Sequence, residues 1–309
     1  MNTAADISNL QHAARGRARA PSRLADYLEL TKPRMNFLVV ITTMVGYYMA
    51  ARGLSSHRTS DWLRLFHTLL GTAATAASAA ALNHLLERRF DAMMRRTANR
   101  PLPAGRVSPT EALTLGVATG VFGVAYLAIL VNPLTAILGG ATLLAYVLIY
   151  TPLKRYTTLN TVIGAFPGAI PTVMGWTAYH NALSPEALVL FGILFLWQMP
   201  HFLAIAILYK DDYARGGFKM LPVLDEDLTI TGRQIILYTL ALLPVTLLPT
   251  AMGMAGIAYF AAALLLGLAF LSFGASAAAT RTRTDARKLF FSSIIYLPVL
   301  FAAMMIDKL

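Results

Sequence analysis

The chain has 309 residues, of which 57% are hydrophobic and only 13% are charged. A typical soluble domain is about 45–50% apolar and about 25% charged, so this composition excludes a water-soluble globular enzyme. The sequence contains no cysteine, which excludes disulfides, thiolate metal sites and a cysteine nucleophile. The formal net charge of +11 needs a separate explanation, which the positions of the charged residues supply.

The chain begins with a polar segment, residues 1–30, that lacks the apolar core and cleavage site of a signal peptide. We expect this segment to be a cytoplasmic tail and residues 31–309 to form a single membrane domain. Apolar runs of about 20 residues, the length that crosses a hydrocarbon core about 30 Å thick, follow the tail. We therefore predict an all-α polytopic membrane protein with nine transmembrane helices. The predicted spans are residues 36–51, 65–86, 111–131, 133–150, 158–178, 186–208, 234–252, 255–275 and 289–306.

Lysine and arginine are distributed unevenly between the two ends of these spans. The N-terminal segment and the loops after spans two, four, six and eight hold 22 of the 26 Lys and Arg residues. The positive-inside rule therefore places the N-terminus in the cytoplasm. The membrane that we expect is the inner membrane of a bacterial cell. Topology and anionic membrane lipid account for the positive charge, so no nucleic-acid partner is expected. Because the long polar loops share one side, we expect a central cavity that opens to the cytoplasm.

Three oxygen-bearing side chains, Asn83, Glu87 and Asp91, end the second predicted span at four-residue intervals. On an α-helix each is turned about 40° from the last, so all three line one face. Such ligands suit Mg²⁺, which takes one or two carboxylates and completes its shell with water and substrate phosphates. Arginines in the following loop, including Arg95 and Arg100, can hold phosphate oxygens. The alternative is that the carboxylates are solvated and paired with neighbouring arginines.

A second charged cluster, Lys210, Asp211 and Asp212, follows the sixth predicted span. Spans two and six are four spans apart, so both helices run in the same direction and both acidic clusters lie at one depth. Facing each other across a cavity, the two clusters could hold two Mg²⁺ ions on one diphosphate.

The spacing of Asn83, Glu87 and Asp91 resembles the Asn-x-x-x-Asp-x-x-x-Asp motif of the UbiA-type intramembrane prenyltransferases, with Glu in the middle position. The chain departs from that superfamily at a second Asp-x-x-x-Asp, where Arg215 and Gly216 replace the later aspartates. Several further segments resemble the protohaem IX farnesyltransferase (haem O synthase) branch. These are residues 91–102, 150–155, 175–176, 197–202 and 210–223.

This resemblance implies a membrane prenyltransferase that uses Mg²⁺ to join farnesyl diphosphate to a vinyl group of haem B, giving haem O and diphosphate. It implies a haem A synthase or oxidase assembly factors as partners, besides membrane lipid. It assigns the metal-binding and catalytic roles to Asn83, Glu87, Asp91, Asp211 and Asp212. The diphosphate contacts that it implies are Arg95, Arg100, Tyr150, Lys154, Arg155 and Lys210.

The histidines leave one question open. Only His67, His84 and His201 lie in or near apolar segments, without the two pairs that a haem-bearing electron carrier needs. His201 follows Pro200, which can kink the sixth span and free backbone carbonyls towards a cavity. His201 either makes an interhelical hydrogen bond or binds and orients haem.

Two other functions remain open at this point. A UbiA-type enzyme could instead prenylate an aromatic quinone precursor, but the segments 197–202 and 210–213 favour haem. A secondary transporter for an anion could also place cations around a cavity between Pro- and Gly-broken helices. Its charges are expected near the midplane, whereas here they cluster at one membrane edge.

Overall fold

The computed structural model describes residues 22–51 and 59–309. Within these ranges the chain is helical, and its one β-type pairing is an isolated bridge between Ala255 and Lys308. Residues 1–21 of the expected N-terminal tail lie outside the described residues, as do Arg52 and Arg58 of the charge count.

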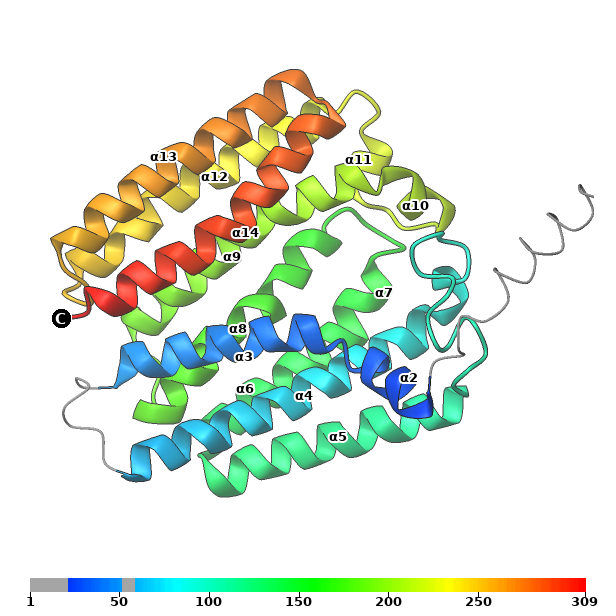
Figure 1. Cartoon of the computed structure of the whole chain (residues 1–309), viewed down its shortest axis with the longest axis horizontal. Coiled ribbons are helices and arrows are strands. Elements are labelled where there is room, and N and C mark those ends of the chain that lie inside the picture. Colours follow the sequence, from blue (N-terminus) through cyan, green and yellow to red (C-terminus); the bar gives the residue numbers. More distant parts are fainter. Residues whose placement is uncertain (1–21, 52–58) are drawn as a thin grey trace, which may run out of the picture.

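Long helical segments lie side by side in one bundle, and the short helices α2 (Arg23–Leu30), α10 (Lys210–Arg215) and α11 (Leu221–Leu224) lie at one end of it (Figure 1). The C-terminus lies at the other end. The long segments are α3 (Pro33–Ala50), α4 (Thr59–Asp91), α5 (Pro109–Leu130), α6 (Pro133–Leu144) with its continuation η2 (Ala145–Tyr150) and α7 (Thr151–Leu153), α8 (Asn160–His180), α9 (Pro185–Leu208), α12 (Thr229–Ala251), α13 (Ile257–Thr280) and α14 (Arg283–Ile306).

Seven of the described segments are long and apolar enough to cross a membrane, so the protein is a multi-pass membrane protein. The two long helices outside this group are α3 and α8, with 18 and 21 residues. Most of α8 is buried inside the bundle, and its sequence is rich in Gly, Ala, Pro and Thr. Small residues are typical of helix interfaces in membranes because they let backbones approach closely, which explains the lower hydropathy of this interior helix.

Helix starts follow local sequence signals. Ser108 forms a capping box with Glu111 at the start of α5, and Pro109 takes the first helical position. The Asn132 side chain accepts a hydrogen bond from the Thr135 backbone N–H at the start of α6. The Asn132 cap lies in the short connection between α5 and α6.

Part of the segment that we expect to be an N-terminal tail is helical. Residues 23–30 form α2, in which Leu30 and Asp26 are buried. The Arg106 guanidinium donates a 2.8 Å hydrogen bond to Asp26, which joins α2 to the loop after α4. Helix α2 therefore buries one apolar and one paired acidic side chain, and the domain boundary at residue 31 stays a prediction.

Helices α3 and α8 cross with their backbones in direct contact. A Cβ atom added to Gly46 would lie 1.9 Å from the Thr172 carbonyl oxygen, and one added to Gly175 would lie 1.9 Å from the Thr43 carbonyl oxygen. No side chain fits at either position without moving a helix. The position of α3 against the interior helix therefore depends on these two glycines.

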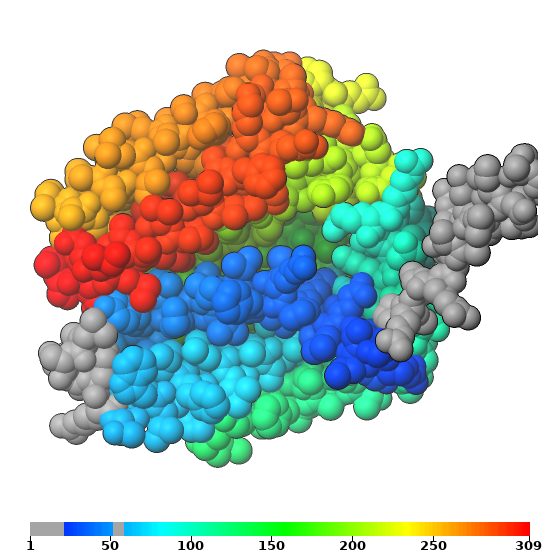
Figure 2. Space-filling model, viewed as in Figure 1, coloured from blue at the N-terminus to red at the C-terminus, as the bar shows by residue number. Residues whose placement is uncertain are grey.

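Helices α3 and α14 meet near the C-terminal end of the chain, where the Tyr48 hydroxyl donates to the Met305 carbonyl oxygen at 3.3 Å. Towards the other end the two helices diverge (Figure 1). Figure 2 shows the furrow between them, with green segments from the middle of the chain at its floor. The bundle is therefore hollowed on its side, near the end that carries α10.

We expect Gly175→Ala to lower the stability of the protein by about 1–3 kcal/mol, the usual cost of overpacking. The matched control is Gly140→Ala, because a Cβ there would lie 3.6 Å from its nearest neighbour, in ordinary contact. Melting temperatures in detergent test this expectation. Equal melting temperatures for the two variants would contradict the backbone contact between α3 and α8.

Candidate active site

Helix α4 extends unbroken to Asp91 and so carries the whole predicted acceptor stripe. Asn83, Glu87 and Asp91 are 1%, 6% and 0% exposed. The alternative of solvated carboxylates is therefore wrong, because all three side chains are covered. Buried carboxylates need partners, and other parts of the chain provide them.

Glu87 pairs with Lys154, whose ammonium donates to the carboxylate at 2.7 Å. The same ammonium lies 4.5 Å from the centre of the Tyr150 ring and 5.9 Å from that of Phe218. Burial acts to lower the pKa of Lys154, but the charge and hydrogen bond of Glu87 outweigh it and raise that pKa above its usual value. Lys154 is therefore a fixed positive charge beside the acceptor stripe.

Asp91 pairs with Arg100, which donates a 2.7 Å hydrogen bond to carboxylate oxygen Oδ2. The other oxygen, Oδ1, is buried and has no hydrogen-bond partner among the described residues. A buried carboxylate oxygen without a partner is costly unless a ligand, ion or water satisfies it. This atom is a direct structural indication that the site takes a further group.

Asn83 is held from two sides. Its side-chain oxygen accepts a 2.7 Å hydrogen bond from the Lys32 ammonium, and its side-chain nitrogen donates to the Thr151 hydroxyl at 3.1 Å. Lys32 has a left-handed backbone conformation, with φ of 48°, directly before Pro33. Burial, followed by the charge of Arg100, lowers the pKa of Lys32 to about 7.

The π-helical turn Ala145–Tyr150 positions the residues that face α4. Pro152 has no backbone N–H and its ring crowds the carbonyl of residue 148, so the helix widens before it. The Thr151 hydroxyl donates to the carbonyl oxygen of Tyr146, five residues earlier, at 2.8 Å. The widened turn places the Thr151 hydroxyl beside Asn83, and Lys154 follows three residues later.

The loop after α9 packs against these elements. The Lys219 backbone N–H donates to the Lys154 carbonyl oxygen at 2.7 Å, and the Asn160 side chain donates to the Lys219 carbonyl oxygen at 2.9 Å. Phe218 and Met94 are buried in a small apolar cluster beneath the loop. The two predicted motif regions, after α4 and after α9, therefore meet at one end of the bundle.

The second acidic cluster is more exposed than the first. The Asp212 carboxylate accepts a 3.2 Å hydrogen bond from the Arg95 backbone N–H and also pairs with Arg215. Asp211 is 67% exposed and pairs with Arg283 at 2.5 Å. Hydrogen bonding to Arg283 lowers the pKa of Asp211 below its usual value. All four carboxylates of the two clusters thus carry a cationic partner.

Two side chains that are predicted to contact diphosphate bind other groups in the structure. The Lys210 ammonium donates to the carbonyl oxygens of Asp225 and Glu226 at 3.3 Å, so it holds α11 rather than the acidic cluster. The Arg155 guanidinium lies over the Phe90 ring, 4.1 Å from its centre. In the described ranges no group of three or more His, Asp or Glu side chains is already arranged around a metal position.

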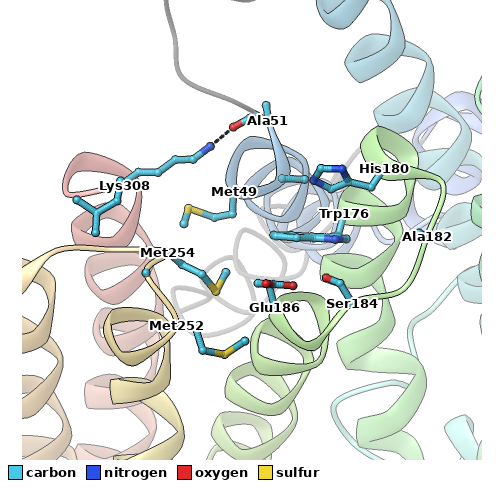
Figure 3. A pocket seen from close by; sticks show the side chains of 13 residues that line it. Met49, Ala51, Trp176, His180, Ala182, Ser184, Glu186, Met252, Met254 and Lys308 are labelled. Atoms are coloured by element: carbon cyan, nitrogen blue, oxygen red, sulfur yellow. Dashed lines mark hydrogen bonds between the residues drawn. The ribbon is translucent and has the colours of Figure 1, made fainter.

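A cavity with a volume of about 600 Å³ lies at the opposite end of the bundle. Figure 3 shows Trp176, Glu186 and three methionines around it, with Lys308 reaching the Ala51 carbonyl. None of the predicted site residues lines this cavity.

Several residues around the acceptor stripe were not predicted from the sequence. Lys32 and Thr151 bind Asn83, and His84 is buried with no partner for either ring nitrogen within the described ranges. Lys32 had a usable signal, because it is a cation directly before the first span on the side that carries the acidic motifs. Thr151 had none, since its position depends on the π-helical turn.

Known proteins with similar sequences cover nearly the whole chain. The chain is 47% identical to the protoheme IX farnesyltransferase of Solibacter usitatus over 289 residues, which covers 92% of this chain and 99% of that protein. It is 44% identical to the protoheme IX farnesyltransferase of Koribacter versatilis, covering 93% of this chain and 94% of the relative.

Solved structures show the same fold at low sequence identity. A structure of digeranylgeranylglyceryl phosphate synthase has a TM-score of 0.74 and 17% identity, with 92% of this chain and 98% of that chain covered. A UbiA homologue from Archaeoglobus fulgidus, bound to GPP and Mg²⁺, has a TM-score of 0.61 and 15% identity, with 90% and 99% covered. Residues 39–295 match the sequence pattern of the UbiA prenyltransferase family. The chain belongs to the UbiA prenyltransferase family.

Proposed function

We propose that this protein transfers a farnesyl group from farnesyl diphosphate to a vinyl group of haem B, giving haem O and diphosphate. The observation that carries the proposal is the buried stripe on α4, in which each carboxylate faces a cation and one carboxylate oxygen has no partner among residues 22–51 and 59–309. The names of the relatives at 44–47% identity identify the substrates. They also favour haem over a quinone precursor, and the family excludes the anion-transporter alternative.

The donor set fits Mg²⁺, the metal bound with GPP in the Archaeoglobus fulgidus homologue. Asn83, Glu87 and Asp91 offer hard oxygen ligands, and the unpartnered Oδ1 of Asp91 is a ready acceptor for a cation. Asp211 and Asp212 would serve a second ion. When bound, Mg²⁺ supplies positive charge that stabilises the departing diphosphate.

The cations of the chain then take a second role. In the ligand-free arrangement Lys154 and Arg100 neutralise Glu87 and Asp91. When a diphosphate binds, Lys154 and Arg100 would turn from the carboxylates to the phosphate oxygens, where Lys32, Arg95 and Arg155 would join them. A metal ion at the stripe would then neutralise Glu87 and Asp91 in their place, so these two buried carboxylates would keep a positive partner in both states.

The reaction joins two apolar substrates at this edge of the membrane. The bond between farnesyl C1 and the diphosphate oxygen breaks, and the electron pair leaves with diphosphate. The terminal vinyl carbon of haem B attacks C1, and water adds to the inner vinyl carbon and loses a proton. The rings of Tyr146 and Tyr150, 5.1 Å apart, offer aromatic faces beside Lys154 that can stabilise the allylic cation.

We also propose the arrangement in the membrane. All of the long segments, including α3 and α8, span the bilayer, which gives nine spans. The end that carries α10 faces the cytoplasm, the N-terminus is cytoplasmic and the membrane is the bacterial inner membrane. The furrow between α3 and α14 admits both apolar substrates from the lipid to a cavity on that side (Figure 2). Haem O then passes to a haem A synthase or to an oxidase under assembly.

Expression in membranes supplied with haem B and farnesyl diphosphate should produce a more hydrophobic haem, detected by chromatography and mass. The mass should rise by one farnesyl group and one hydroxyl group. Membranes given an aromatic quinone precursor in place of haem B serve as the comparison. A prenylated aromatic product, with haem B unchanged, would replace this proposal with the quinone alternative.

Asp91→Asn should lower turnover by at least about 100-fold, because it removes one charged group that acts on the leaving diphosphate. The matched control is Asp26→Asn, since Asp26 is also buried and paired with an arginine, Arg106, but lies outside the site. Turnover is measured per folded protein over a range of Mg²⁺ concentrations. Asp211→Asn should also lower turnover. Equal losses for Asp91→Asn and Asp26→Asn would show that only packing is affected.

Cysteines can be introduced singly into this cysteine-free chain to test the orientation. In intact cells, a membrane-impermeant thiol reagent should label Ala182→Cys, in the loop at the opposite end, and spare Ala104→Cys, in the loop after α4. Both positions are exposed. The reverse labelling pattern would place the active site on the outer side.

A further inference from the structure

Two aromatic side chains of α9 converge on one residue of α14. The Trp197 indole N–H donates to the Ser293 carbonyl oxygen at 2.9 Å. One helical turn later, ring nitrogen Nδ1 of His201 lies 2.7 Å from the hydroxyl oxygen of the same serine. His201 is therefore held by an interhelical hydrogen bond, as one of the two interpretations of the sequence expects.

The direction of that hydrogen bond follows from a third contact. The Ser293 hydroxyl oxygen lies 2.6 Å from the carbonyl oxygen of Phe290. Two oxygen atoms this close need a proton between them, and a carbonyl has none to give. The serine therefore donates its only proton to Phe290, and Nδ1 of His201 must be the donor to Ser293. In a neutral imidazole this arrangement leaves the lone pair on Nε2.

The ring that carries this lone pair is held in a defined orientation. It stacks on Trp197, with ring centres 4.9 Å apart and planes 20° apart, and on Phe290, with 5.2 Å and 28°. Nε2 has no hydrogen-bond partner in the described part of the chain, and His201 is only partly buried. Histidines that ligate metals characteristically donate their other ring N–H to an oxygen, which fixes both tautomer and orientation.

We propose that Ser293 is a positioning residue that holds His201 with Nε2 free to ligate the iron of the haem substrate. This inference rests on the proposed function and names the atom that binds haem. His201 lies seven residues before the end of α9, so about 10 Å of helix separates it from the end that leads to Asp211 and Asp212. Iron lies at the centre of the porphyrin and the vinyl groups at its edge. Iron bound to His201 would lie inside the bundle, and the diphosphate would lie at the end of the bundle that carries the acidic clusters. A vinyl group at the porphyrin edge then lies between these two positions, next to farnesyl C1.

The test compares Ser293→Ala with Ser292→Ala in the full-length protein. Ser292 is the matched control, because its hydroxyl also donates to the carbonyl three residues earlier, Leu289, at 2.8 Å, but does not contact His201. Haem B affinity is measured by absorption titration, and the iron–histidine stretching band of the ferrous complex by resonance Raman spectroscopy. Farnesyl diphosphate affinity and melting temperature are measured alongside.

Ser293→Ala is expected to weaken haem B binding by about 10- to 100-fold, the usual loss when the partner of a ligating histidine is removed. The iron–histidine band should shift to lower frequency, because the ligand loses the hydrogen bond that raises its basicity. Ser292→Ala should behave as wild type, and His201→Ala should lose the band. Farnesyl diphosphate affinity should stay unchanged in all three variants.

An unchanged band and haem affinity in Ser293→Ala would overturn the positioning role. If the haem complex of His201→Ala has the same spectrum as that of the wild-type protein, His201 does not ligate the iron. In either case formation of haem O by the wild-type protein would leave the proposed function standing. Conversely, a wild-type protein that shows the band but makes no haem O would overturn the proposed function and leave the ligand assignment intact.

Discussion

The architecture of the site depends on the need to neutralise carboxylates that α4 carries into a buried position. Glu87 and Asp91 are nearly inaccessible, and an unpaired charge there would be strongly destabilising. Their partners, Lys154 and Arg100, come from the π-helical end of one segment and from the loop after α4. Pairing these charges therefore fixes where two other parts of the chain must lie. The same pairs keep the cations within reach of the position that a diphosphate would take.

Close packing of helix backbones elsewhere in the bundle positions the residues of the site. Helix α8 is built largely of small residues and lies against α3 with no space for a side chain at Gly46 or Gly175. Such close packing in lipid replaces the hydrophobic driving force that holds soluble cores together. This packing also fixes how far α3 is shifted along its axis relative to α8. It thereby fixes the position of Lys32, which precedes α3 and donates to Asn83.

Local patterns predicted what depends on a single helix. The apolar runs indicated the spans, and the four-residue spacing of Asn83, Glu87 and Asp91 placed them on one face of α4. Contacts between distant segments could not be predicted in this way. The pairing of Asn83 with Lys32 and the folding of α2 against Arg106 join residues 51 and 80 positions apart. The acidic cluster after α9 was expected to face the first directly. Asp212 pairs with Arg215, three residues later on the same helix, but Asp211 pairs with Arg283, 72 positions away, which no spacing rule indicates.

The backbone hydrogen bond from Lys219 to Lys154 has a consequence for how the two halves of the site communicate. Lys154 has its side chain on the stripe of α4, while its carbonyl oxygen holds the loop that follows Asp211 and Asp212. A main-chain shift that carries the ammonium from a carboxylate to a phosphate is therefore shared by the second loop. Thermodynamic linkage makes that influence mutual, so whatever orders the second loop also biases the position of Lys154. Under the proposed function, binding at one of the two loops is therefore coupled to binding at the other.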